Sequence, residues 1–201
     1  MTKRIIGLTG GIATGKTTVA NYLANAYHLP ILDADIYARD AVCVGSPILD
    51  AIASHYGEQI LLANGDLNRQ KLGEIIFHNP EERFWIENLI HPYVRDRFQG
   101  EISTSTAKTL VLVVPLLFEA GMTDLVTEIW VVYCSEQQQL ERLMQRNNLT
   151  LEQAQARIHS QMSITEKAAR ADVILDNSST LEALLKQVDA ALTEMPFKSI
   201  L

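Results

Sequence analysis

The chain has 201 residues, of which 47% are hydrophobic and 20% are charged, and its formal net charge is −7. This length suits one α/β domain with room for a smaller inserted part, and the composition indicates a folded protein rather than a disordered one. The negative net charge and the lack of a long basic run argue against general nucleic-acid binding, and the longest apolar run, residues 110–118, is too short to span a bilayer.

Residues 3–10 form a short apolar run that ends in glycine, which predicts a buried strand. Apolar residues then recur at helical spacing and predict one face of a helix: Val19, Tyr22, Leu23, Ala26 and Tyr27. Further apolar runs predict four more strands, at residues 29–35, 109–115, 128–134 and 172–176. Because helical patterns separate them, we expect an α/β fold with a five-stranded parallel sheet and helices on both faces.

The long gap between the second and third strands, from about Tyr37 to Lys108, is mostly helical in pattern and predicts a helical insertion that covers the carboxyl edge of the sheet. One helix face is marked by Ile86, Leu89, Ile90, Tyr93 and Val94. Pro92 lies inside this pattern and should kink or interrupt the helix. Near the end of the chain, Ser179 followed by Glu182 fits a capping box, after which leucines and valine form an apolar stripe.

A phosphate-binding motif lies between the first strand and the first helix. Gly10, Gly15, Lys16 and Thr17 have the spacing G-x-x-x-x-G-K-T of a P-loop. Glycines let the backbone curl so that its N–H groups point at phosphate oxygens, and the helix that follows adds its positive end. Lys16 would reach the β- and γ-phosphates and the Thr17 hydroxyl would bind Mg²⁺, so a nucleoside triphosphate and Mg²⁺ are expected at this loop.

Two aspartates, Asp33 and Asp35, close the second strand. Ligands bind outside the carboxyl ends of such strands, where a carboxylate can orient an attacking hydroxyl and accept its proton. An Asx turn or a helix cap is the alternative, and it is the stronger alternative at Asp35, which precedes a helical stretch. We therefore favour Asp33 for the chemistry.

Arg142 and Arg146 lie four residues apart on one helix face, with Arg157 further on. Such arginines could close over phosphates and stabilise charge in the transition state. A solvated charged face, with Glu141 and Glu152 as partners, is the alternative, and it is preferred for Arg157. His91, beside Pro92, is more often structural when it stands alone.

Cys43 and Cys134 are far apart and predict neither a disulfide framework nor a zinc site. We expect both to be small buried residues in a reducing compartment. The first residues carry charges like those of a signal peptide, but the apolar run stops at Gly10 and meets Lys16, which argues against secretion. The expected location is the cytoplasm, with no membrane partner.

Six segments together make the sequence similar to the dephospho-coenzyme A kinase family: GLTGGIATGKTT, LDAD, LNRQKLGEIIF, NLIHPYVR, VVPLLFE and ADVILDNSS. The resemblance runs from Lys3 to about Leu192 and implies transfer of the ATP γ-phosphoryl group to the ribose 3′-hydroxyl of dephospho-CoA. The implied catalytic residues are Asp33, Lys16 and Arg142. The implied ATP-binding residues are Gly10, Gly11, Ile12, Ala13, Thr14, Gly15, Lys16, Thr17, Thr18, Arg146 and Asn177, with Thr17 also the metal ligand. The implied acceptor-binding residues are Asp33, Asp35, Arg39, His91, Arg95, Leu116, Phe118 and Glu119.

The resemblance also implies a division of the chain. Residues 1–36, 108–135 and 168–201 would form the nucleotide-binding core, 37–107 the helical CoA-binding insertion and 136–167 a helical lid. Ala13 stands where the family usually has glycine, so we expect a loop that avoids positive φ there. A monomer or a small homo-oligomer is expected.

Two alternatives use parts of the same pattern. A P-loop kinase of another small metabolite would share the P-loop and Asp33, whereas the insertion and VPLLFE favour dephospho-CoA. A nucleotide-dependent switch would require a guanine-selecting N-K-x-D motif, which the sequence lacks.

Overall fold

The computed structural model describes residues 3–194, so residues 1–2 and 195–201 of the expected core lie outside the described part. The chain divides into two compact units, the first comprising Met1–Leu32 with Ser105–Leu201 and the second Asp33–Thr104. Within residues 3–194, no helix has both the length and the apolar character needed to cross a membrane.

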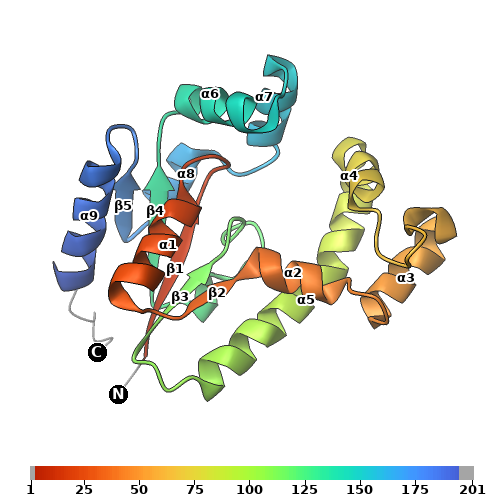
Figure 1. Ribbon diagram of the computed structural model, residues 1–201, viewed down its shortest axis with the longest axis horizontal. Helices are drawn as coiled ribbons and strands as arrows, with labels where there is room; N and C mark the ends of the chain where they lie inside the picture. Colours follow the sequence, from red (N-terminus) through yellow and green to blue (C-terminus); the bar gives the residue numbers. More distant parts are fainter. Residues whose placement is uncertain (1–2, 195–201) are drawn as a thin grey trace. The chain divides into compact units, whose positions relative to one another are not determined.

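A five-stranded sheet forms the centre of the fold, in the order β2-β3-β1-β4-β5 (Figure 1). Its strands are β1 (Arg4–Gly10), β2 (Ile31–Asp33), β3 (Thr109–Val113), β4 (Glu128–Tyr133) and β5 (Val173–Asp176). The central strand β1 pairs in parallel with both β3 and β4, and β4 pairs in parallel with β5. All five predicted strands and the parallel sheet are therefore confirmed.

One face of the sheet is covered by α1 (Lys16–Tyr27) and α9 (Leu181–Glu194), which also contact each other (Figure 1). Alternate residues of the strands meet apolar residues of both helices in a continuous buried core: Ile6, Leu8, Val111, Val113, Trp130, Val132, Leu175, Val19, Leu23, Leu184 and Val188. The predicted stripe of α1 is buried at Val19 and Leu23, but Ala26 and Tyr27 at its end are exposed. The hydroxyls of Tyr22 and Tyr27 donate to Asp189 Oδ1, which joins the two helices and raises the pKa of Tyr27 to about 12.

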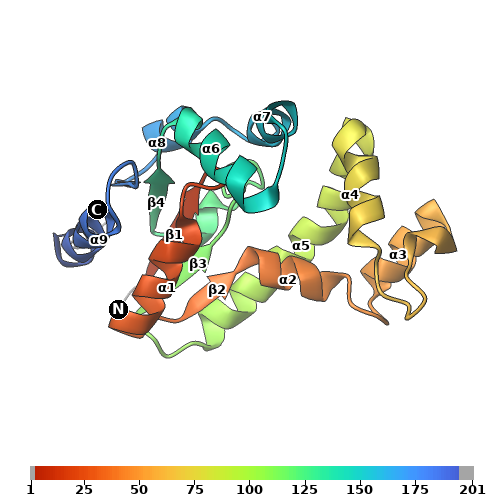
Figure 2. The ribbon, with the colours of Figure 1, turned by 45° about the horizontal axis from the view of Figure 1, so that its top comes forward.

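Three further helices of this unit are α6 (Glu136–Asn147), α7 (Leu151–His159) and α8 (Ile164–Ala169). α6 and α7 lie side by side around a small core of Leu143, Ala154 and Ile158 (Figure 2). α8 packs instead against β1 and β4. Each of the three begins with a serine or threonine whose side chain accepts a backbone N–H, in a capping box.

The second unit is helical, as the pattern predicted. It contains α2 (Ala34–Ala41), α3 (Pro47–Tyr56), α4 (Arg69–His78) and α5 (Pro80–Thr104). The predicted face of α5 packs into the core of this unit, in which Ile86 is buried and Leu89, Ile90 and Tyr93 are half-buried. The helix continues through Pro92, so it is not interrupted there, and a kink at this residue stays a prediction.

Two smaller expectations are wrong. The last helix begins one residue later than the capping-box pattern indicated, because the Thr180 hydroxyl accepts the N–H of Ala183 at 3.2 Å. Cys43 is exposed, since it lies in the turn that follows α2, whereas Cys134 is buried as expected.

An almost buried ion pair joins the start of β1 to the start of β4, and its arginine also binds the end of α9. The Arg4 guanidinium is paired with Glu128 and also donates to the carbonyls of Ala191 (3.1 Å) and Leu192 (2.9 Å). Trp130 Nε1 donates to the other Glu128 oxygen at 3.1 Å. The arginine therefore satisfies carbonyls that the end of a helix leaves without partners.

We expect Arg4→Met to lower the free energy of unfolding by about 3–5 kcal/mol, because it leaves the Glu128 carboxylate buried without its cation. Urea unfolding of the purified protein measures this, with exposed Arg157→Ala as the control for loss of one positive charge. Adding Glu128→Gln should recover part of the loss. A stability unchanged in Arg4→Met would contradict the assignment.

Candidate active site

The P-loop connects β1 to α1, and at two of its residues there is no room for a side chain. Gly10 has φ 152° and Gly15 has φ 105°, in the region that L residues rarely adopt. A Cβ on Gly10 would lie 2.5 Å from the Val132 carbonyl oxygen, and one on Gly15 would lie 2.3 Å from Asn177 Nδ2. These glycines are thus required by the conformation of the loop and by its close neighbours.

No side chain caps the N-terminus of α1. By contrast, side chains cap α2, α3, α4, α6, α7 and α8. The first turn of α1 also lacks an acidic residue. A glycine-lined curl with uncapped helical amides and one lysine fits a phosphate group, which would supply the missing acceptor.

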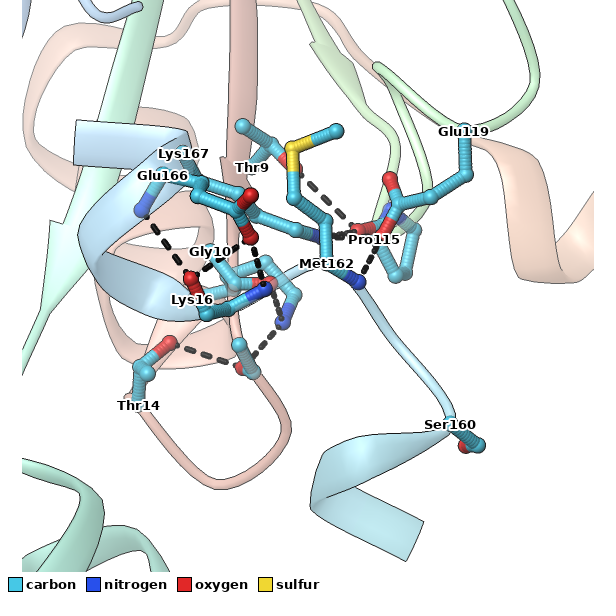
Figure 3. Close-up of polar contacts among 12 residues, drawn as sticks. Thr9, Gly10, Thr14, Lys16, Pro115, Glu119, Ser160, Met162, Glu166 and Lys167 are labelled. Atoms are coloured by element: carbon cyan, nitrogen blue, oxygen red, sulfur yellow. Dashed lines mark hydrogen bonds and ion pairs between the residues drawn. The ribbon is translucent and has the colours of Figure 1, made fainter. Parts of the chain in front are cut away.

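Lys16 begins α1, and its ammonium turns back onto the loop (Figure 3). Its Nζ donates to the carbonyls of Gly10 at 3.0 Å and Gly11 at 2.7 Å. The Thr14 hydroxyl also donates to Gly11 O, at 2.9 Å. The positive charge therefore lies within the curl itself, whereas Thr17 and Thr18 are exposed on the first turn of the helix.

Ala13 contradicts the expectation that the loop avoids positive φ at this residue, since its φ is 60°. A left-handed conformation costs an L residue about 1–2 kcal/mol. Ile12 and Ala13 both pack against the small core between α6 and α7. Burial of the Ala13 methyl group offsets part of that cost, which explains how the loop keeps this conformation without glycine.

A hydrogen-bonded chain joins the P-loop to α6. Asn177 Nδ2 donates to Thr14 O at 2.8 Å, and Arg142 Nη2 donates to Asn177 O at 2.8 Å. Arg142 thus binds a backbone carbonyl rather than Glu141, its expected partner on a solvated face. Arg146 lies one turn further along α6, is exposed and donates to Asn147 Oδ1.

Gln139 is a second link between α6 and the loop, and it had no signal in the sequence. It is 2% exposed, and a Cβ on Gly11 would lie 2.3 Å from its Oε1. Its Nε2 is buried and has no hydrogen-bond partner in the described structure. Since buried polar groups are rarely left unpaired, this amide fits a site in which a group bound at the loop would accept its hydrogen bond.

The turn after β3 carries the expected acceptor-side residues Leu116 and Phe118, both half-buried, and Glu119. The Thr9 hydroxyl donates to Pro115 O at 3.2 Å, which joins this turn to the last residues of β1. Buried Lys167, which sequence reasoning missed because lysine is usually exposed, pairs with Glu119. Burial raises the pKa of the Cys134 thiol, directly after β4, so it stays protonated and is a poor nucleophile.

The other expected residues belong to the second unit. Asp33 is the N-cap of α2, where its Oδ1 accepts the N–H of Asp35 at 2.8 Å. The cap is therefore Asp33, whereas Asp35 is exposed in the first turn. Arg39 is exposed near the end of α2, and its carbonyl accepts from Arg69. His91 and Arg95 are half-buried and four residues apart on α5, so they share one helix face.

Comparisons with known proteins agree with this architecture. The family model described as dephospho-CoA kinase matches residues 4–183. The chain is 76% identical over 192 residues to the dephospho-CoA kinase of Trichormus variabilis, which covers 96% of this chain and 98% of that protein. The solved dephospho-CoA kinase of Campylobacter jejuni aligns with a TM-score of 0.70 at 31% identity, over 96% of both chains. A shikimate kinase from Bacteroides thetaiotaomicron, at 14% identity and TM-score 0.54 over 96% of this chain and 99% of that one, shares the fold alone.

Proposed function

Because the chain belongs to the dephospho-CoA kinase family, we propose that it transfers the γ-phosphoryl group of ATP to the ribose 3′-hydroxyl of dephospho-CoA, the last step of coenzyme A synthesis. The observation that supports it most directly is the uncapped N-terminus of α1 beside the Lys16 ammonium and two left-handed glycines. This arrangement offers several N–H donors and one cation to a polyphosphate.

In the proposed reaction, the 3′-oxygen forms a bond to the γ-phosphorus while the bond from that phosphorus to the ADP oxygen breaks. Phosphoryl transfer has a loose transition state, so orientation and charge stabilisation contribute more than full deprotonation. Lys16 would stabilise the phosphate oxygens, and Asp33 would orient the hydroxyl and accept its proton. The Thr17 hydroxyl would hold Mg²⁺, which would supply positive charge to neutralise the phosphate groups.

We further propose roles for the remaining residues. The loop residues Gly10 to Thr18 would bind the triphosphate, and Asn177 and Arg146 would lie beside the nucleotide. Asp35, Arg39, His91, Arg95, Leu116, Phe118 and Glu119 would bind the acceptor. Residues 37–107 would then act as the CoA-binding insertion and residues 136–167 as a lid on the core formed by 1–36, 108–135 and 168–201. The proposed setting is the cytoplasm, for a monomer or small homo-oligomer.

The test is an ATP-dependent phosphorylation assay with the purified protein. Dephospho-CoA is compared with nucleosides, gluconate and shikimate as acceptors, and ATP with GTP as donor. We expect rapid, Mg²⁺-dependent formation of CoA and ADP from ATP and dephospho-CoA, and no comparable transfer to the other acceptors. Preference for another acceptor would favour a different metabolite kinase, and slow GTP hydrolysis without transfer would favour a nucleotide switch.

The arginines of α6 give a second test. We expect Arg142→Ala and Arg146→Ala each to lower turnover by about 10- to 100-fold, the effect of losing one hydrogen bond to a charged group. Melting temperatures should change little, since neither side chain is buried in the core. Arg157→Ala, at an exposed residue of α7, is the matched control and should retain turnover. Unchanged kinetics in both α6 variants would make these arginines ordinary surface charges.

A further inference from the structure

Lys167, on α8, is a buried cation that the proposed reaction does not use. Its side chain is 0% exposed. The ammonium donates to Pro115 O at 2.8 Å and is paired with Glu119 Oε1 at 2.9 Å (Figure 3). Moving an ammonium out of water is unfavourable unless it gains such partners, so its location depends on the turn that carries them.

Each acceptor of this ammonium is also held by a second donor. Glu119 Oε1 accepts the backbone N–H of Met162 at 2.9 Å, and Pro115 O accepts the Thr9 hydroxyl at 3.2 Å. Met162 lies between α7 and α8, and Thr9 immediately precedes the first glycine of the P-loop. One cation therefore joins the segment returning from α7 to the turn after β3, and that turn is bonded to the end of β1.

Arg170, three residues after Lys167, contacts the same loop that follows β3. Its guanidinium lies over the Phe118 ring, 5.7 Å from the centroid. Residues three apart at the end of a helix share a face, so α8 and the residue after it contact two consecutive residues, Phe118 and Glu119. The Glu119 side chain nevertheless stays 24% exposed, which leaves part of its surface accessible to a ligand.

We propose that Lys167 is a positioning residue that fixes Glu119 and the turn of residues 115–119 in the geometry that binds the phosphoryl acceptor. This inference rests on the proposed function, in which that turn contacts dephospho-CoA. Glu119 Oε1 accepts from both Lys167 and the backbone N–H of Met162. The position of residues 115–119 therefore depends on the segment that follows α7. A purely structural ion pair would stabilise α8 without affecting acceptor affinity.

The test uses Lys167→Met, Glu119→Gln and the double variant, each as the full chain. Dephospho-CoA affinity is measured by calorimetry without ATP, together with KM for each substrate, kcat and melting temperature. We expect Lys167→Met to weaken dephospho-CoA binding by about 10- to 100-fold, the effect of one lost charged hydrogen bond, with KM for ATP unchanged.

The double variant separates positioning from stability. It removes both charges, so it should recover melting temperature lost in Lys167→Met, but acceptor affinity should stay low. Lys167→Arg keeps the cation and should recover part of the affinity.

The proposal is overturned if Lys167→Met lowers the melting temperature while dephospho-CoA affinity stays normal, or if affinity returns with stability in the double variant. If the unmodified protein neither binds nor phosphorylates dephospho-CoA, the proposed function fails as well. That result is distinct from a failure of positioning alone, in which the unmodified protein is active.

Discussion

Lys16→Ala is expected to lower turnover with ATP by about 10²–10³-fold, the usual effect of removing one fixed donor from developing phosphoryl charge. The ammonium already lies inside the P-loop, bonded to the carbonyls of Gly10 and Gly11. A phosphate in the curl would offer it a charged acceptor in place of these neutral ones. The fold should persist, because Lys16 is half-buried at the start of α1 and is not part of the apolar core.

The measurements for Lys16→Ala are turnover, ATP affinity and melting temperature. Lys186→Ala is the matched control, since it removes the same charge from an exposed site on α9, where the side chain pairs with Glu182 of the same helix. It should behave like the unmodified protein. Near-normal turnover in Lys16→Ala would overturn the assignment of residues 10–17 as a triphosphate-binding loop.

The sheet could be predicted from the sequence because its central strands are buried on both faces and therefore read as continuous apolar runs. Residues 109–113 and 128–133 are such runs, and both are strands. The P-loop was equally visible, since the backbone itself demands glycine at residues 10 and 15. In both places the local structure, a strand buried on both faces or a backbone that only glycine can adopt, restricts the residue type. A single sequence is therefore enough to predict it.

Other features depend on neighbours that are distant in sequence. Nothing near Lys167 predicts its burial, because its acceptors lie about fifty residues earlier, at Pro115 and Glu119. Gln139 looks like any polar residue on an amphipathic helix, yet it packs against Gly11. Ala13 adopts positive φ against its own preference because α6 and α7 provide a packing site for it. Tertiary contacts override local preference in all three cases.

Asp33 carries the other large expected effect, and one substitution can separate its observed role as a helix cap from its proposed role as the base. Its side chain caps α2 by accepting the N–H of Asp35. The proposed chemistry instead uses the negative charge, to orient the ribose hydroxyl and accept its proton. Asparagine caps helices about as well as aspartate, whereas alanine does not cap them.

We therefore expect Asp33→Asn to lower turnover by about 10²–10⁴-fold, the usual contribution of a general base, with melting temperature and ATP affinity little changed. Asp33→Ala should show the same loss of turnover and, in addition, a stability loss of about 0.5–2 kcal/mol from the missing cap. Asp35→Asn is the neighbouring comparison and should have a smaller effect on turnover, because the proposal uses Asp35 to bind the acceptor and Asp33 as the base. If Asp33→Asn kept normal turnover while Asp33→Ala lost only stability, Asp33 would be a capping residue alone. The catalytic carboxylate would then have to be Asp35 or Glu119, and the corresponding Asn and Gln variants would identify it by loss of turnover.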